Sequence, residues 1–177
     1  MPATVLLIPG LNDSGPHHWQ SLWHAANPGF VRVVQRDWET PDRAEWVAAL
    51  DGYVTAIEGP VVLVAHSLAC ITVAHWARAH GARNVSSALL VAPSDVEADF
   101  FPPGTTGFTP LPVEALPFPS TLVASTNDPY LRMARARALA AGWGSRLVDV
   151  GPAGHIHTDA GFGPWPEGEA MLRALVG

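Results

Sequence analysis

The chain has 177 residues, of which 48% are hydrophobic and 15% charged, and its 16 acidic and 10 basic residues give a net charge of −6. This balance is typical of a folded domain rather than a disordered segment. Every basic residue is Arg and none form a run, which disfavours nucleic acid and anionic membrane as partners. At this length, and without an internal repeat, we expect residues 1–177 to form one domain.

The N-terminus and the cysteine count indicate a compartment. The first apolar run ends at Pro9-Gly10, far short of the roughly 20 residues of a membrane span, and no basic leader precedes it. Cys70 is the single cysteine, so no internal disulfide is possible, and no zinc-binding Cys/His spacing occurs. We therefore expect a soluble, cytoplasmic protein with no metal and no organic cofactor. The oligomeric state stays open.

Short aliphatic runs alternate with stretches of helical periodicity along the chain. Several runs are apolar at every position, as in strands buried on both faces of a parallel sheet. The predicted elements are strand 4–8, helix 16–25, strand 31–35, helix 43–58, strand 61–65, helix 68–80, strand 86–92, strand 120–125, helix 129–142, strand 146–150 and helix 167–176. Their alternation predicts a three-layer α/β/α sandwich with right-handed crossovers.

The segment from Pro93 to Pro119 interrupts this alternation. It holds seven of the chain's 17 prolines, so neither a helix nor a central strand is expected there. A loop of that length in a small domain is usually functional or mobile. Because it follows the fourth strand, at the carboxyl edge where open α/β sheets place their sites, we expect it to form part of a pocket wall.

The motif with the clearest chemistry is Ala65-His66-Ser67-Leu68-Ala69, between a predicted strand and a predicted helix. This is the context of a G-x-S-x-G nucleophile elbow, in which a strained turn exposes the serine and needs small neighbours on either side. Both small positions hold Ala here rather than Gly. Ser67 is the candidate nucleophile, and the alternative is that it only caps the following helix, where serine is favoured.

A serine nucleophile needs a histidine base and an acid that orients it. In the order Ser, Asp, His the acid follows a later strand, and Asp128 stands in that position after the fifth strand. With Pro129 behind it, Asp128 is also a good helix N-cap, and the two roles are compatible. The competing acids are Asp95, just past the fourth strand, and Asp159, close to the candidate histidine.

His155 is the best placed of the eight histidines to act as the base. It follows the last strand, and the glycines around it let the loop fold back over the sheet edge toward Ser67. Spacing does not exclude His157, whereas His66 adjoins the serine and is expected to point away from it. The remaining histidines are expected on the surface or in helix packing: His17, His18, His24, His75 and His80.

An oxyanion hole needs backbone N–H groups aimed at the developing negative charge. The N–H of Leu68, directly after the candidate nucleophile, is one expected donor. The second is expected from the glycine-bearing loop after the first strand, where Leu11 is the first choice and Asn12 the second. A plain strand-to-helix turn would have a similar sequence.

Four segments together resemble a known family. They are PGLNDSGPHHWQ near the N-terminus, AHSLA at the serine, STNDPY after the fifth strand and GPAGHIHTDAGFGPWPEG near the C-terminus. With them, nearly the whole chain resembles the small α/β-hydrolases of the retinoblastoma-binding-protein-9 and YdeN-like serine hydrolase family. The resemblance implies Ser67, Asp128 and His155 as nucleophile, acid and base. We therefore expect a minimal α/β-hydrolase fold with about six parallel strands in the order 2-1-3-4-5-6 and no large helical cap.

The sequence departs from this family at a few positions. His157 stands where Asn is frequent, which leaves the identity of the base slightly open, and Ala69 stands where Gly is common. The retinoblastoma-binding L-x-C-x-E peptide of the animal relative is absent, and residues 68–72 only approach it. We therefore do not expect that partner.

These residues predict a serine hydrolase, and most specifically a carboxylesterase that cleaves a small ester through an acyl-enzyme. An amidase or aminopeptidase would use the same triad, and a binding protein could retain the fold without turnover. A thiol enzyme using Cys70 is the least favoured alternative, because a cysteine within a packed helix lacks the exposed, electropositive setting that activates a thiol. The expected partner is a small ester or amide.

Substrate contacts are the least determined part of the site. Large aromatic residues mostly fill cores, but several lie in loops expected to surround the candidate nucleophile. The candidates for substrate contact are Asn12, Trp19, Phe100, Phe101 and Trp165. Without room for a helical cap, the sequence favours short acyl chains over long ones.

Overall fold

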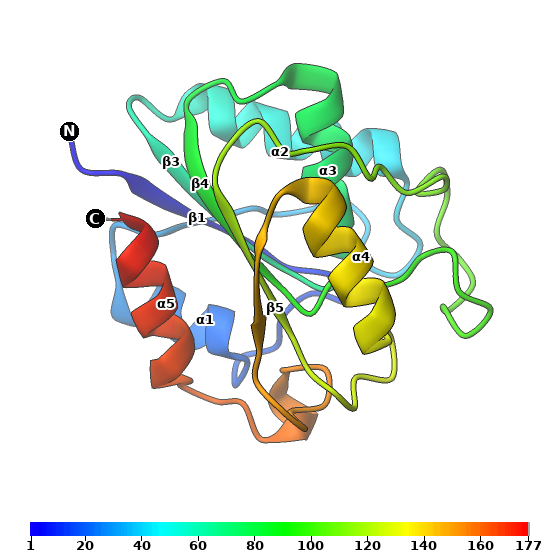
Figure 1. The fold of residues 1–177 in the computed structure, drawn as a ribbon. Helices are drawn as coiled ribbons and strands as arrows, with labels where there is room; N and C mark the ends of the chain where they lie inside the picture. The colour runs from blue at the N-terminus through cyan, green and yellow to red at the C-terminus, as the bar shows by residue number, and fades with distance from the viewer. Residues whose placement is uncertain (177) are drawn as a thin grey trace.

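A computed structural model describes residues 1–176, and a parallel six-stranded sheet lies at its centre (Figure 1). The strands are β1 (Thr4–Ile8), β2 (Val31–Arg32), β3 (Val61–His66), β4 (Val85–Val91), β5 (Ser120–Ala124) and β6 (Arg146–Asp149). Their order is β2-β1-β3-β4-β5-β6, which confirms the predicted topology. Every residue of β3 and β5 is buried, as expected for strands covered on both faces.

Within residues 1–176, five α-helices cover the two faces of this sheet (Figure 1), and a short 3₁₀ helix, η1 (Thr158–Ala160), precedes the last of them. The α-helices are α1 (Trp19–Ala26), α2 (Arg43–Ala56), α3 (Leu68–His80), α4 (Met133–Trp143) and α5 (Pro166–Val176). Successive side chains of a strand point to opposite faces, so Leu63 packs with α2, α3 and α4 in one apolar cluster, while Val64 packs with α1 and α5 in another. The three-layer arrangement follows from these two cores.

Two predicted elements near the N-terminus differ from the structure. The helix expected at 16–25 begins at Trp19, because His18 caps it by accepting a hydrogen bond from the backbone N–H of Gln20 at 3.2 Å. The strand expected at 31–35 has only two ladder residues. Its pairing ends after Val33 donates to the carbonyl of Leu7 at 2.9 Å, which leaves β2 as a short edge strand.

The helix expected at 129–142 also begins later, at Met133. Asp128 forms a local turn by accepting a hydrogen bond from the backbone N–H of Tyr130 at 2.8 Å, and Arg132 takes the N-cap position instead. The prediction of Asp128 as the N-cap was therefore wrong. The remaining predicted helices and strands begin and end within two residues of the observed ones.

The segment between β4 and β5 contains no helix or strand, as its prolines predicted. It contacts the rest of the fold through an isolated bridge between Thr106 and Asp42, and it carries the buried side chain of Phe108. Within residues 1–176, no helix is both long and apolar enough to cross a membrane.

Candidate active site

The turn between β3 and α3 holds Ser67 in a strained conformation, with φ 59° and ψ −125°. Its backbone N–H donates to the carbonyl of Val91 at the end of β4 at 3.0 Å, which fixes the turn to the neighbouring strand. Gly10 packs directly against this turn, because a Cβ added there would lie 2.7 Å from the carbonyl oxygen of His66. Only glycine lets the loop after β1 approach the serine so closely.

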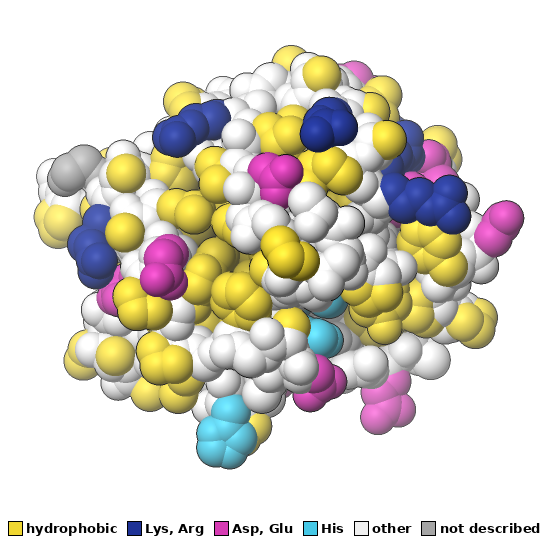
Figure 2. Space-filling model, turned by 60° about the horizontal axis from the view of Figure 1, so that its bottom comes forward, with side chains coloured by type: hydrophobic (Ala, Val, Ile, Leu, Met, Phe, Trp, Pro, Cys, Tyr) yellow, Lys and Arg dark blue, Asp and Glu magenta, His cyan; other side chains and the backbone are white. Residues whose placement is uncertain are grey.

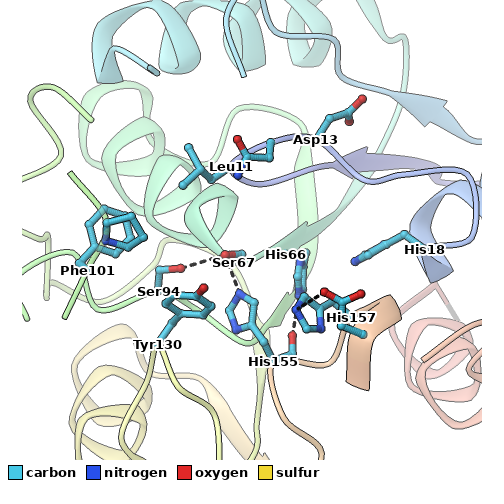
Figure 3. A pocket seen from close by; sticks show the side chains of 13 residues that line it. Leu11, Asp13, His18, His66, Ser67, Ser94, Phe101, Tyr130, His155 and His157 are labelled. Carbon is cyan, nitrogen blue, oxygen red and sulfur yellow. Dashed lines mark hydrogen bonds and ion pairs between the residues drawn. The ribbon is translucent and has the colours of Figure 1, made fainter. Parts of the chain in front are cut away.

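The side chain of Ser67 takes part in a line of hydrogen bonds rather than capping α3 (Figure 3). Its Oγ lies 2.8 Å from His155 Nε2, and His155 Nδ1 lies 2.9 Å from each carboxylate oxygen of Asp128. All three residues are buried. This arrangement fits a Ser-His-Asp triad, in which the carboxylate holds the imidazole so that Nε2 faces the hydroxyl.

Two polar side chains after β5 hold the loop that carries His155. Asn127 Oδ1 accepts a hydrogen bond from the backbone N–H of Gly154 at 2.7 Å, and Ser125 Oγ accepts one from Ala153 at 2.9 Å. Gly154 has φ 56°, in the left-handed region where glycine is unstrained. Because Asn127 precedes Asp128, one short segment fixes both the acid and the backbone beside the histidine.

Two of the predicted substrate contacts, Trp19 and Trp165, lie in the core instead of the pocket. Both are buried, with ring centroids 5.1 Å apart, and neither lines the cavity at Ser67. The indole N–H of Trp19 donates to the carbonyl of Ile156 at 3.0 Å, directly after His155. Trp19 therefore anchors the loop that carries His155 from the core side. The predictions that Trp19 and Trp165 contact the substrate were both wrong.

The neighbouring phenylalanines in the proline-rich loop have different positions. Phe101 lines the cavity, as predicted, whereas Phe100 is exposed outside it, with the guanidinium carbon of Arg132 at 5.5 Å from its ring centroid. Pro102 and Ser94, from the same loop, also line the cavity. The loop thus forms a wall of the pocket, as expected, but Phe100 is not part of that wall.

The two backbone groups predicted for the oxyanion hole lie beside Ser67. Neither the Leu68 nor the Leu11 N–H has a hydrogen-bond partner within residues 1–176. A Cβ on Gly10, the residue before Leu11, would lie 3.2 Å from the Leu68 nitrogen, so the two loops meet here. The Asn12 N–H, the second choice, donates to the carbonyl of Trp38 at 2.8 Å, although Asn12 itself lines the pocket.

The competing carboxylates are not within reach of His155. Asp95 Oδ1 lies 3.4 Å from Arg135 Nε, away from the imidazole. Asp159 is largely exposed at the pocket rim, with one oxygen 4.0 Å from His157 Nε2. Of the candidate acids, only Asp128 contacts His155.

Besides His155, three histidines line the pocket: His18, His66 and His157. The expectation that His18 lies on the surface or in helix packing, away from the site, was therefore wrong. His66 Nε2 contacts the backbone carbonyl of His155 at 2.9 Å, and the His18 and His66 ring centroids are 4.8 Å apart. Desolvation by burial lowers the pKa of His18 from 6.5 to about 3, helped by the nearby His157 and Arg32. Burial also lowers the pKa of His66 well below its ordinary value. Both rings are therefore neutral at pH 7.

Sequence reasoning missed Ser94, whose Oγ lies 2.9 Å from Ser67 Oγ. The available signal was a small polar residue just after β4, at the edge of the sheet where sites form. Tyr130 was also missed, and its ring packs edge-on against His155 with the centroids 4.7 Å apart.

The single cysteine is unsuited to nucleophilic chemistry. Cys70 is fully buried in α3, and its Sγ faces the carbonyls of Ala65 and Val91 at 3.5 Å. Burial raises the pKa of the thiol well above its ordinary value. The thiolate that a cysteine nucleophile requires is therefore disfavoured. Among the described side chains, no group of three or more His, Cys, Asp or Glu residues is arranged to hold a metal ion.

The pocket has a volume of about 370 Å³ and two chemically different sides. Figure 3 shows Phe101 and Tyr130 on one side of Ser67, and His66, His157 and His18 on the other. In the space-filling view of Figure 2, histidine atoms lie at the bottom of a hollow, with hydrophobic and acidic side chains around it. A substrate whose reacting bond lies at Ser67 can thus place an apolar group on one side of the cavity and a polar group on the other.

A serine on a strained turn after a central parallel strand, bonded to histidine and then to aspartate, defines the class of α/β hydrolases. The chain belongs to the serine hydrolase family, whose model matches residues 5–174. This match and the similarity to YdeN-like hydrolases confirm the family that the sequence motifs predicted.

Among solved structures, a YdeN-like hydrolase from Pectobacterium atrosepticum is 35% identical, with a TM-score of 0.87 over 99% of this chain and 91% of that one. The ydeN gene product of Bacillus subtilis is 19% identical, with a TM-score of 0.73 over 98% of both chains. An esterase from Rhodococcus sp. shares the fold at 12% identity, with a TM-score of 0.74 over 99% of this chain and 90% of that one. No curated protein shows a significant match.

Proposed function

We propose that this serine hydrolase is a carboxylesterase, with Ser67 as nucleophile, His155 as base and Asp128 as the acid that orients it. The observation that carries the proposal is the 2.8 Å contact between Ser67 Oγ and His155 Nε2, on a serine held at φ 59°. A serine that only capped a helix would need neither the strained backbone nor the imidazole.

In the first half of the reaction, Ser67 Oγ attacks the ester carbonyl carbon while its proton passes to His155 Nε2. The carbonyl oxygen becomes an oxyanion, and the free N–H groups of Leu68 and Leu11 are the donors proposed to stabilise it. The bond to the alcohol then breaks, and the leaving oxygen takes the proton from Nε2. The product is an ester of Ser67.

In the second half, water gives a proton to His155 Nε2 and attacks the acyl carbon. Collapse of the second tetrahedral intermediate breaks the bond to Ser67 Oγ, which recovers its proton from His155. Asp128 accepts the hydrogen bond from Nδ1 and stabilises the imidazolium that forms in both halves. The products are a carboxylic acid and the free enzyme.

The apolar side of the pocket favours a short acyl chain. Leu11, Phe101 and Pro102 offer a hydrophobic surface in a cavity of about 370 Å³. Carbons beyond this wall would stay in water, and each unburied CH₂ forgoes about 0.8 kcal/mol. The names of two distant structural neighbours, an esterase and a monoacylglycerol lipase, support an ester as substrate.

The test is a series of nitrophenyl esters from acetate to palmitate, assayed with the wild-type protein and with Ser67→Ala. We expect kcat/KM to be highest for short chains and Ser67→Ala to remove essentially all turnover, because no other placed nucleophile replaces Oγ. A maximum at long chains would overturn the short-chain preference, and activity of Ser67→Ala near that of the wild type would remove Ser67 from the mechanism.

An amidase or peptidase with the same triad gives a different result in this experiment. Such an enzyme would leave every ester intact and cleave the corresponding anilides, because only the fit of the pocket separates the two activities. A binding protein with a hydrolase fold would cleave neither.

A further inference from the structure

A second serine, which the mechanism above does not use, lies against the proposed nucleophile. Ser94 Oγ is 2.9 Å from Ser67 Oγ, and Ser94 is only 2% exposed. Figure 3 shows the Ser94 hydroxyl pointing at Ser67 from the loop that follows β4. Within the described part of the chain, this is the only hydrogen bond of the Ser94 side chain.

The backbone around Ser94 is held on both sides. Ala92 adopts φ 48°, which is costly for a residue with a Cβ, and its N–H donates to the carbonyl of Val123 at 2.8 Å. On the other side, the Asp95 N–H donates to the carbonyl of Tyr130 at 2.9 Å. These two backbone hydrogen bonds, one on each side of Ser94, hold its backbone in place.

The direction of the serine–serine hydrogen bond follows from the rest of the line. A carboxylate only accepts, so His155 Nδ1 carries the proton that faces Asp128, and the neutral ring has an acceptor at Nε2. Ser67 therefore donates its only hydroxyl proton to Nε2. The contact at 2.9 Å then requires Ser94 as the donor and Ser67 Oγ as the acceptor.

We propose that Ser94 is a further catalytic residue, whose hydroxyl donates a hydrogen bond to Ser67 Oγ while the nucleophile gains charge. The inference rests on the proposed role of Ser67. As the Ser67 proton passes to His155, negative charge grows on Oγ, and a buried donor already aimed at that atom stabilises it. Ser94 keeps its own proton and forms no covalent bond.

The same donor acts when the acyl-enzyme breaks down. Oγ then leaves the acyl carbon with the bonding electron pair before it takes a proton from His155. Because this step retraces the first one, a donor that stabilises charge on Oγ in one direction also does so in the other. Loss of the hydroxyl therefore slows both half-reactions, while the binding of the acyl group stays unchanged.

The test compares variants that differ only in the hydroxyl. Ser94→Ala removes the donor, and Ser94→Thr and Ser94→Val have nearly the same shape but only the first retains a hydroxyl. We expect kcat on a short nitrophenyl ester to fall about 10- to 100-fold in Ser94→Ala, with KM within about twofold of wild type, because a hydrogen bond to a charged group is lost. The kcat of Ser94→Thr is expected to exceed that of Ser94→Val by a similar factor.

A matched control is available at the opposite end of the sheet. Ser120 Oγ makes a partly buried serine–serine hydrogen bond to Ser145 Oγ at 2.7 Å, at the start of β5. Ser120→Ala is expected to leave kcat unchanged. Equal kcat in Ser94→Thr and Ser94→Val, or a Ser94→Ala effect confined to KM and melting temperature, would overturn the proposal and leave Ser94 a packing residue.

A covalent probe separates this proposal from the proposed function. Labelling by a fluorophosphonate requires attack of Ser67 Oγ on phosphorus, so its rate can be measured without knowing the natural substrate. We expect slower labelling of Ser94→Ala than of wild type. Equal rates would overturn the role of Ser94 alone, whereas an unlabelled wild-type protein would overturn the nucleophile itself.

Discussion

Two buried histidines lie side by side in the pocket, and they differ in their partners. The ring centroids of His155 and His66 are 4.9 Å apart. His155 faces the carboxylate of Asp128, whereas the only hydrogen bond of the His66 side chain within residues 1–176 is to the backbone carbonyl of His155. Burial disfavours the charged form of an imidazole, whereas an adjacent carboxylate stabilises an imidazolium that forms beside it. The comparison shows why one ring can accept a proton during a reaction and its neighbour holds the loop in place.

Removing His155 gives the largest effect that this comparison predicts. His155→Ala is expected to lower kcat on the order of 10⁵- to 10⁶-fold, as much as loss of Ser67, because groups that act as a unit fail together. His157→Ala, in which the altered ring makes no contact with Ser67, is expected to cost at most about tenfold. Rates with a nitrophenyl ester measure both. Equal losses in the two variants would show that the base is shared.

Replacement of Asp128, the proposed acid, is expected to give the next largest loss of kcat. Asp128→Asn is expected to lower kcat about 10⁴-fold, because an amide donor facing Nδ1 favours the wrong tautomer of His155. Asp95→Asn and Asp159→Asn are the matched controls, since both remove a carboxylate near the site that does not touch the imidazole. The assignment fails if either control is more damaging than Asp128→Asn.

The smallest effect concerns the neutral histidines and appears in stability rather than activity. The folded pKa of His18 is about 3, so between pH 3 and 6.5 the unfolded chain binds a proton that the folded protein does not. The free energy of unfolding therefore falls as the pH decreases through this window. Between pH 7 and 5.5 we expect His18 to account for about 1 kcal/mol of the loss.

Urea denaturation at pH 7 and pH 5.5 measures this contribution of His18 to the free energy of unfolding. His18→Asn retains an acceptor for the helix N-cap but removes the titrating ring. Between pH 7 and 5.5, the free energy of unfolding of this variant is therefore expected to fall by about 1 kcal/mol less than that of the wild type. His17→Ala replaces an exposed histidine and is expected to leave the pH dependence unchanged. A pH dependence that is the same in wild type and His18→Asn would contradict a neutral, buried His18.

Sequence patterns were sufficient for the features that repeat or that follow strands. Apolar runs predicted the strands of the sheet, and Ser67, Asp128 and His155 each follow such a run, so their meeting at one edge was predictable. The start of α1 was mispredicted because the side chain of His18 supplies the cap. A cap of that kind leaves no periodic signal.

Other parts of the site depend on geometry that composition does not encode. Ser94, which contacts Ser67, comes two residues after Ala92, and Ala92 takes a left-handed conformation that is uncommon for alanine. Trp19 was expected at the substrate because its loop lies near the site. Its indole N–H instead finds the carbonyl of Ile156, as buried tryptophans usually find a partner.

The most direct test of the account is the position of the covalent label. The wild-type protein is treated with a fluorophosphonate, digested and mapped by mass spectrometry, with Ser67→Ala as the control. We predict a single modified residue, Ser67, because its hydroxyl alone faces His155 Nε2 at 2.8 Å, and no label in the variant. Modification of Ser94 or of any other serine, with Ser67 left unmodified, would contradict the central claim.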